Sequence, residues 1–283
     1  MDGNYIVTKS NYFIMNCNYD LSLEEQKLIL TLASMVQPEN EEFKPYIFKI
    51  SEFIKLLRVE TQTKYTEIPK ITKELMKKVL EIQEGKTLLQ VAWLSSARYE
   101  KGSGMVTLKF SPDLKPYMLQ LKNNFTQYQL ANILSMKSKY SPRIYEILKC
   151  NEFKKQGNIE IDVVDLRKLL RAEDIYPLYA DLKRKIIKQT QKELKKISDI
   201  NFNFEEIKTG RKVTSLKFYI NTNKTKNKAI EEACVTLEGK YTNEEEKHFI
   251  ELINEVKSIF KENISGVQAK SILDTRSEEC RVG

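Results

Sequence analysis

The polar and apolar residues of this chain follow helical and strand periods in an order that can be followed from the N-terminus. Residues 21–36 place apolar side chains on one helical face, and Ser22 with Glu25 matches the S-x-x-E capping pattern of a helix start. Residues 44–50 form an apolar, strand-like piece, and Ser51 is the expected N-cap of a short second helix. The pattern predicts a helix, a strand and another helix.

A third helix is expected to carry lysines opposite an apolar stripe. From Ile68 the stripe continues through Ile71, Leu75, Val79 and Ile82. The opposite face carries Lys70, Lys73 and Lys77. Residues 88–110 then hold two β-rich segments around a Gly-Ser-Gly turn at 102–104, which predicts a hairpin.

The second half of the chain repeats this plan. A helix is expected from Ser141 as N-cap, with Pro142 in its first turn. The segments that follow are a strand at 158–164, a short helix at 165–171, a long helix at 182–197 and a hairpin at 200–220. The two halves therefore share one order of elements.

Short strings recur at matching places in the two halves. "KLLRVE" at 55–60 returns as "KLLRAE" at 168–173, and "VTLKF" at 106–110 returns as "VTSLKF" at 213–218. The two matches differ in offset by five residues, and such length changes belong in turns between repeated units. The pattern indicates an internal duplication.

Helix, strand, helix, helix and hairpin is the order of a winged helix-turn-helix domain. We therefore predict an α+β fold with two tandem winged helix-turn-helix domains, at 1–121 and 122–221, followed by a polar linker and a C-terminal helical tail at 222–283. The repeated string is then the supporting helix of each domain, with Leu57 and Leu170 in the core. Its basic residues, which either touch phosphates or are solvated, are Lys55, Arg58, Lys168 and Arg171.

Positive charge is concentrated in one segment. The 283 residues carry a formal net charge of +8, and residues 181–196 alone hold seven basic residues against two acidic ones. On the expected long helix, the face opposite the apolar stripe carries Arg184, Lys185, Lys188, Lys192 and Lys195. A helix fits the major groove, so this face is a candidate surface for double-stranded DNA. The alternative is a set of solubilising surface residues.

Other classes of function fit the residue inventory poorly. No apolar run approaches the roughly 18 to 20 residues of a membrane span, so a cytoplasmic protein without membrane contact is expected. The four cysteines are scattered, and "EGKT" at 84–87 lacks the upstream glycine of a phosphate-binding loop. His248 is the only histidine, which argues against nucleases that need a histidine-ligated metal. We expect no metal, no cofactor and no enzymatic activity.

Several stretches together resemble a known family. They are "SMKSKYSPRIYEILK" (135–149), "DLRKLL" (165–170), "INFNFEEIKTGRKVTSLKFYI" (200–220) and the opening "NYFIMNCNYDLSLEEQKLILTLAS" (11–34). The combined pattern is similar to the replication initiator (Rep) family of iteron-bearing, theta-replicating plasmids. This resemblance implies binding of direct repeats at the plasmid origin, repression of the protein's own gene by a homodimer, and contacts with the host replication initiator and helicase.

The resemblance also assigns DNA contacts by position. The long helix of the second domain is implied to be the principal major-groove reader, through Lys183, Arg184, Lys185, Lys188 and Lys192. Arg184 is the expected base contact, because a guanidinium can bridge O6 and N7 of guanine. The first domain is implied to contact the other part of the site through Lys70, Lys73 and Lys77, and the second hairpin turn to hold phosphates through Lys208, Arg211 and Lys212.

Two other functions remain open at the level of sequence. A winged-helix transcriptional regulator would use the same contacts without any role in replication. A protein-interaction module would use the winged helices without DNA, and it would show no steep dependence of binding on salt.

Overall fold

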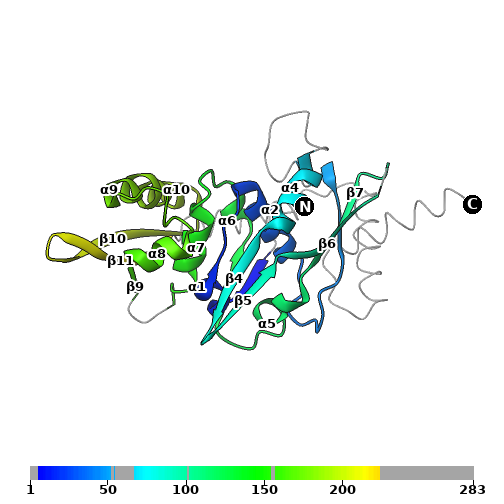
Figure 1. Cartoon of the computed structure of the whole chain (residues 1–283), viewed down its shortest axis with the longest axis horizontal. Coiled ribbons are helices and arrows are strands. Elements are labelled where there is room, and N and C mark those ends of the chain that lie inside the picture. The colour runs from blue at the N-terminus through cyan, green and yellow to red at the C-terminus, as the bar shows by residue number, and fades with distance from the viewer. Residues whose placement is uncertain (1–5, 52–53, 55–66, 101, 154–156, 224–283) are drawn as a thin grey trace, which may run out of the picture.

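The computed structural model describes residues 6–51, 54, 67–100, 102–153 and 157–223. The first copy of the repeated string, with Lys55, Leu57 and Arg58, lies outside these residues, as does the helix expected in the C-terminal tail. The chain forms two units that lie side by side along the long axis of the molecule (Figure 1). We call the elements from β1 to α6 the first unit and those from α7 to β11 the second unit.

The first unit combines short helices with three small sheets. Its helices are α1 (Asn11–Asn16), α2 (Leu23–Ser34), α4 (Glu67–Lys77), η1 (Pro112–Leu114), α5 (Lys115–Met118) and α6 (Ala131–Leu134). Its strands are β1 (Ile6–Ser10), β2 (Cys17–Asn18), β3 (Tyr46–Lys49), β4 (Val79–Glu84), β5 (Thr87–Ala92), β6 (Leu94–Tyr99), β7 (Met105–Phe110) and β8 (Phe125–Gln129).

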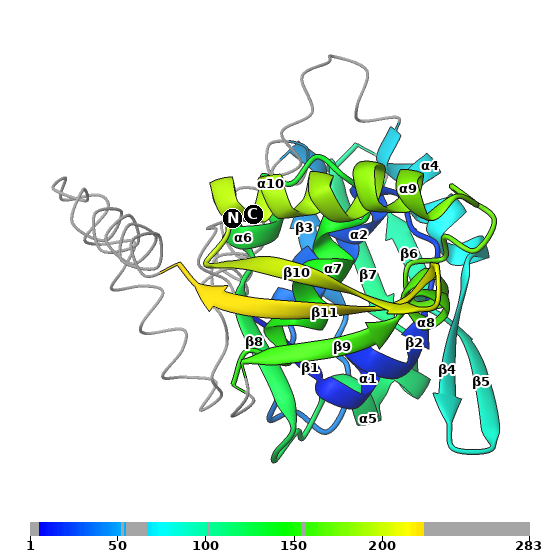
Figure 2. The same cartoon turned by 90° about the vertical axis from the view of Figure 1, so that its left-hand side faces the viewer.

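The second unit contains one three-stranded sheet and a long helical run above it (Figure 2). Its helices are α7 (Ser141–Lys149), α8 (Val163–Leu169), α9 (Tyr179–Leu182), the π-helical η2 (Lys183–Ile187) and α10 (Lys188–Ile197). Its strands are β9 (Asn158–Asp162), β10 (Ile200–Thr209) and β11 (Lys212–Thr222).

The internal duplication is confirmed by the sheet topology. In the first unit β3 pairs antiparallel with β7, which pairs with β6; in the second unit β9 pairs with β11, which pairs with β10. In both units the strand that precedes the repeated string thus joins the last strand of the hairpin. Phe110 and Phe218, which the repeated strings equate, are both buried. Two winged-helix units in an α+β fold are therefore what the chain forms.

The prediction for the third helix is wrong about where the helix ends. Helix α4 stops at Lys77, and Val79 and Ile82, expected on its apolar stripe, lie in β4. Strand β4 pairs with β5 in a hairpin that has no counterpart among the described residues of the second unit, and Cys17 of β2 lies opposite Ile82 in the same sheet. The segment "EGKT" forms the turn of this hairpin, with Gly85 at a φ of 58°.

Two helix starts test the capping predictions. At α2 the capping box is confirmed, since the Ser22 hydroxyl accepts from the Glu25 amide at 3.2 Å and the Glu25 carboxylate accepts from the Ser22 amide at 2.7 Å. At α7 the prediction is wrong by one residue, because Tyr140 is the N-cap and Ser141 is already helical. The Ser141 hydroxyl is buried and instead donates to Thr190 Oγ1 on α10 at 3.2 Å.

Helix α7 is the structural link between the two units. All nine of its residues, Ser141–Lys149, are buried. On one side of the helix Glu146 accepts hydrogen bonds from Lys9 of β1 and Tyr128 of β8, two strands that pair with each other across more than 110 positions of the chain. Another side packs on α10. The predicted domain boundary at 121/122 stays a prediction.

Candidate nucleic-acid interface

The long helical run of the second unit is anchored by a fully buried apolar stripe. Residues 179–197 form α9, η2 and α10 without interruption, and 0% of Leu182, Ile186, Thr190 and Leu194 is exposed. Ile187, the next residue after Ile186, is also fully buried. The i→i+5 turn of η2 widens the helix at this place, which brings two successive isoleucines inward.

The outer face of the same run is cationic. Arg184, Lys185, Lys188 and Lys192 are all exposed. Arg184 Nη2 lies 2.8 Å from Asp181 Oδ1, and Lys185 Nζ lies 3.9 Å from the same oxygen and 4.5 Å from the centre of the Tyr176 ring. With 72% of the Arg184 side chain exposed, its pair with Asp181 is worth at most about 1 kcal/mol, so a stronger partner can displace it.

Lys183 has a different environment from its neighbours. Only 33% of its side chain is exposed, and Nζ lies 2.5 Å from Glu206 Oε1 on β10. The Tyr179 hydroxyl donates to the same carboxylate at 2.8 Å. The hydrogen bond from Lys183 lowers the pKa of Glu206, so this carboxylate stays ionised and ties the helix to the hairpin.

The hairpin of the second unit ends in a basic turn. Gly210 takes a φ of 62°, which the tight turn requires, and the residues around it, Lys208, Arg211 and Lys212, are all exposed. A register shift between Ile207 and Lys208 marks a bulge just before the tip. The tip and α9 lie at the same end of the molecule in both views (Figures 1 and 2).

The first unit presents a shorter basic helix. Ile68, Thr72 and Leu75 of α4 are buried, and its exposed face carries Lys70, Lys73 and Lys77. Lys77 Nζ lies 2.6 Å from Glu74 Oε1, and this hydrogen bond lowers the pKa of Glu74. Helix α4 lies along the same upper edge of the molecule as α9 and α10 in both views (Figures 1 and 2). The two basic helices therefore border one side of the molecule.

Two family models match successive parts of the chain, and the first of them extends through α7. A model described as "Initiator Replication protein, WH1" matches residues 6–149, and one described as "Initiator Rep protein, WH2" matches residues 162–220. The chain belongs to the plasmid replication initiator (Rep) family. The matched residues include both basic helices and the second hairpin.

Relatives in sequence and in structure are also replication initiation proteins. The initiator is 30% identical over 226 residues to a "Replication initiation protein" of Escherichia coli, an alignment that covers 76% of this chain and 69% of the relative. It is 32% identical over 145 residues to the "PI protein" of Escherichia coli, which covers 45% of this chain and 46% of that protein. The crystal structure of the Pi initiator protein in complex with iteron DNA has the same fold, with a TM-score of 0.65 at 18% identity, and the match covers 79% of this chain and 99% of that one.

At the supporting helix of the second unit, Lys168 and Arg171 were both expected to touch phosphates or to be solvated, and Arg171 departs from this expectation. Arg171 has a φ of 47° just after α8, and its guanidinium forms an ion pair with Glu81 of β4 in the first unit. Lys168 is exposed beside Asp165, at 3.5 Å. Of these two cations in the initiator, Lys168 is the one left open to solvent, while Arg171 joins the two units.

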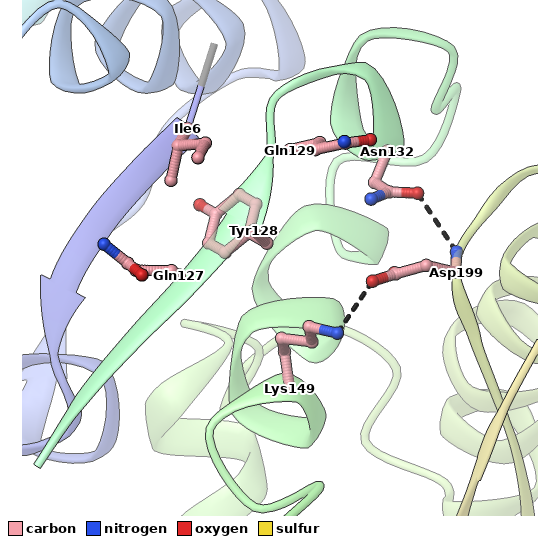
Figure 3. Close-up of a pocket in the computed structure, with 7 residues that line it drawn as sticks. All are labelled: Ile6, Gln127, Tyr128, Gln129, Asn132, Lys149 and Asp199. Carbon is pink, nitrogen blue, oxygen red and sulfur yellow. Dashed lines mark hydrogen bonds and ion pairs between the residues drawn. The ribbon is translucent and has the colours of Figure 1, made fainter. Parts of the chain in front are cut away.

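A pocket of about 230 Å³ lies between β8, α7 and the start of β10 (Figure 3). Lys149 Nζ there lies 2.7 Å from Asp199 Oδ2 and 2.6 Å from Glu152 Oε2, while Asn132 Oδ1 accepts from the Asp199 amide at 3.0 Å. Although burial opposes it, the Asp199 carboxylate raises the pKa of Lys149. One ammonium group is thus shared by two carboxylates, and the contacts of Asp199 hold the start of β10 of the initiator against α7 and α6. Within the described residues no helix is long and apolar enough to cross a membrane.

Proposed function

We propose that this chain starts the replication of a plasmid by binding short direct repeats of double-stranded DNA at the origin. The observation that carries the proposal is the cationic face of α9, η2 and α10, which is exposed opposite a stripe of completely buried residues. A helix held in this way projects its charges outward at the width of a major groove. The related Pi protein, solved in complex with iteron DNA, supports the same partner here.

Each basic element takes a separate part in this binding. Arg184 enters the groove and contacts guanine, because its weak pair with Asp181 is easily exchanged for two hydrogen bonds to O6 and N7. Lys185, Lys188 and Lys192 contact the groove edge and the phosphates. Lys183 supports them from the side, since Glu206 already holds its ammonium group.

The hairpin tip and the first unit extend the contact along the duplex. Lys208, Arg211 and Lys212 hold phosphates beside the groove that α9 enters. Lys70, Lys73 and Lys77 on α4 reach the other part of the repeat. The position of α4 and α10 on one edge of the molecule supports this assignment (Figures 1 and 2).

Further partners follow from the same family. The initiator acts in the cytoplasm without a catalytic step of its own, melts a neighbouring A/T-rich segment and recruits the host initiator and helicase. A homodimer of the chain represses its own gene. These roles rest on the family resemblance, and DNA binding by the basic face is the step on which they depend.

The experiment is a gel-shift titration followed by footprinting on the parent plasmid. If 6 to 10 phosphates are contacted, affinity falls by roughly 10³ to 10⁵ between 50 and 200 mM salt. The footprint is expected over direct repeats of about 20 base pairs, roughly two turns, and Arg184→Ala is expected to abolish plasmid maintenance. Binding that does not change with salt would refute DNA recognition, and a footprint on one isolated palindrome would favour a regulator without a role in replication.

A further inference from the structure

Arg143 is buried at the junction of the two units, where it binds the backbone of both. Only 4% of its side chain is exposed. Nη2 donates to the Cys17 carbonyl of β2 at 2.6 Å, and Nε donates to the Leu169 carbonyl of α8 at 3.3 Å. One guanidinium thus connects the first unit with the supporting helix of the second.

The Leu169 carbonyl needs such a donor because α8 ends there. The last four carbonyls of a helix lack a partner within the helix, and the positive φ of Arg171 turns the chain away before another turn can form. The Cys17 carbonyl lies at the short strand that pairs with β4. Arg143 therefore donates to one backbone carbonyl of each unit, and its two hydrogen bonds connect β2 directly with the C-terminal end of α8.

Glu146, one turn further along α7, keeps the guanidinium in place. Its Oε2 lies 3.9 Å from Arg143 Nη1, and its Oε1 accepts from Lys9 Nζ at 2.7 Å and from the Tyr128 hydroxyl at 2.5 Å. Burial opposes ionisation of this carboxyl, but Lys9 and Arg143 lower its pKa, so Glu146 is charged. Without Arg143 the remaining Lys9–Glu146 pair would be neutral, and the fold would keep a balanced interior.

The position of each basic helix depends on the elements that Arg143 joins. Helix α8 holds the turn before α9, since Arg167 donates to the carbonyls of Ala172, Ile175, Tyr176 and Pro177. Helix α10 packs on α7 through Thr190 and Ser141. In the first unit, α4 packs on α2, which lies against β1. A shift of one unit against the other would therefore move α10 relative to α4.

We propose that Arg143 is a positioning residue that sets the offset between the two DNA-reading helices, and with it the spacing of the two half-sites that one chain accepts. The proposal rests on the proposed function. The proposal about Arg143 extends that function, because it names a buried residue, remote from DNA, that determines specificity. The ion pair of Arg171 with Glu81 is a second contact across the same junction.

The first test measures the offset without DNA. Spin labels are placed on exposed positions of both helices, through Met76→Cys and Gln189→Cys, in the full chain with its four native cysteines replaced by alanine. We expect the distance distribution of Arg143→Met to be about twofold broader than that of the parent, because the units lose a fixed arrangement. Arg143→Lys keeps the buried charge, cannot reach both carbonyls and is expected to broaden it as well. If Arg143→Met does not fold, Arg143→Lys is the variant that is measured.

Arg167→Met is the matched control. It also removes a guanidinium that binds several carbonyls, but all of them belong to the second unit. We expect it to loosen the turn before α9 and lower stability, but to leave the distance distribution unchanged, because the labelled α10 stays packed on α7 through Thr190 and Ser141. Equal, narrow distributions for the parent and both folded Arg143 variants would overturn the proposal.

The second test measures half-site spacing on DNA. The probe is the duplex that the wild-type chain selects from roughly three helical turns of random sequence, together with versions carrying one to five added base pairs at its centre. Each added pair moves the second half-site by about 3.4 Å and turns it by about 35°. Wild type is expected to lose about 100-fold in affinity at five added pairs, and Arg143→Lys less than about tenfold, because loose units still engage both half-sites.

Failure of the proposed function and failure of the proposed role of Arg143 would give different results. If the wild-type chain selects no duplex, the proposed function fails, while the distance measurement still decides whether Arg143 sets the offset. If the duplex is selected and both proteins lose affinity equally with spacing, the role of Arg143 in specificity is wrong.

Discussion

The outer face of α10 should contribute one phosphate contact for each exposed lysine, and Lys188 offers the sharpest test. Its side chain is exposed, while its neighbours Ile187 and Thr190 are completely buried, so removing it leaves the packing of the helix unchanged. Alanine is the best helix former, so Lys188→Ala should alter the free energy of unfolding by only a few tenths of a kcal/mol, of about the size of propensity differences. Any change in binding then reports on charge.

The magnitude follows from counterion release. Each phosphate contact contributes about 0.9 to the slope of log K against log salt concentration on duplex DNA. Lys188→Ala should therefore reduce the steepness of that slope by about 0.9. The difference in DNA affinity between the variant and wild type vanishes near 1 M salt. At 0.1 M salt the variant should therefore bind about tenfold more weakly than wild type. The loss should be the same for specific and random duplexes, because phosphates carry no sequence information.

The assay is fluorescence anisotropy with a labelled duplex at four or more salt concentrations. Lys122→Ala is the matched control, because Lys122 is exposed in the loop after α5, and α5 lies at the lower edge of the molecule, away from α4 and α10 (Figures 1 and 2). It removes the same charge and should leave the slope within error of wild type. Equal slopes for both variants would mean that net charge alone governs binding and that the α10 face is not the contact.

Three further predictions concern specificity, packing and pH. Arg184→Lys should keep the salt slope and reduce discrimination between the selected and a random duplex by about 1 to 3 kcal/mol, measured by competition, because a lysine cannot bridge two acceptors on guanine; unchanged discrimination would remove Arg184 from base contact. Leu170→Ala should lower the free energy of unfolding in urea by about 2 to 5 kcal/mol, since only 5% of Leu170 is exposed, and a change below about 0.5 kcal/mol would contradict its burial. Glu146→Gln should cost about 3 to 5 kcal/mol at neutral pH by leaving Lys9 and Arg143 uncompensated. Because the folded pKa of Glu146 lies below 4.5, that cost should be present above pH 4.5 and shrink as the pH falls through the folded pKa; a constant gap down to acid pH would contradict the ionised state.

The long basic helix and the second hairpin could be predicted because their signals are local. Leu182, Ile186 and Leu194 recur at helical spacing, and the structure buries all three completely. The hairpin has Gly210 between two β-rich segments, and the strands pair as those segments predict. In both cases neighbouring residues determine the backbone, and tertiary packing agrees with them.

The β4–β5 hairpin could not be predicted in the same way. Leu75, Val79 and Ile82 are spaced as on a helix, so the period extends past the true end of α4. What decides the structure is the pairing of Ile82 with Cys17, more than 60 positions away, together with a turn at Gly85. A local period cannot show a partner that distant, and β-branched residues such as Val79 and Ile82 accept the strand readily.

Helix α7 shows why the junction was missed in the sequence. Ile144, Ile147 and Leu148 recur at helical spacing and mark one inward face, but this spacing says nothing about where the charged residues between them lie. The structure buries those charged residues too, because Arg143 and Glu146 face a second unit rather than water. Burial of a charge is favourable only when its partner is supplied, and the partner here is Lys9, 137 positions before Glu146. An amphipathic helix whose polar face is also buried therefore indicates that a second folded unit packs against it, and in this initiator that contact joins the two units that carry the basic helices.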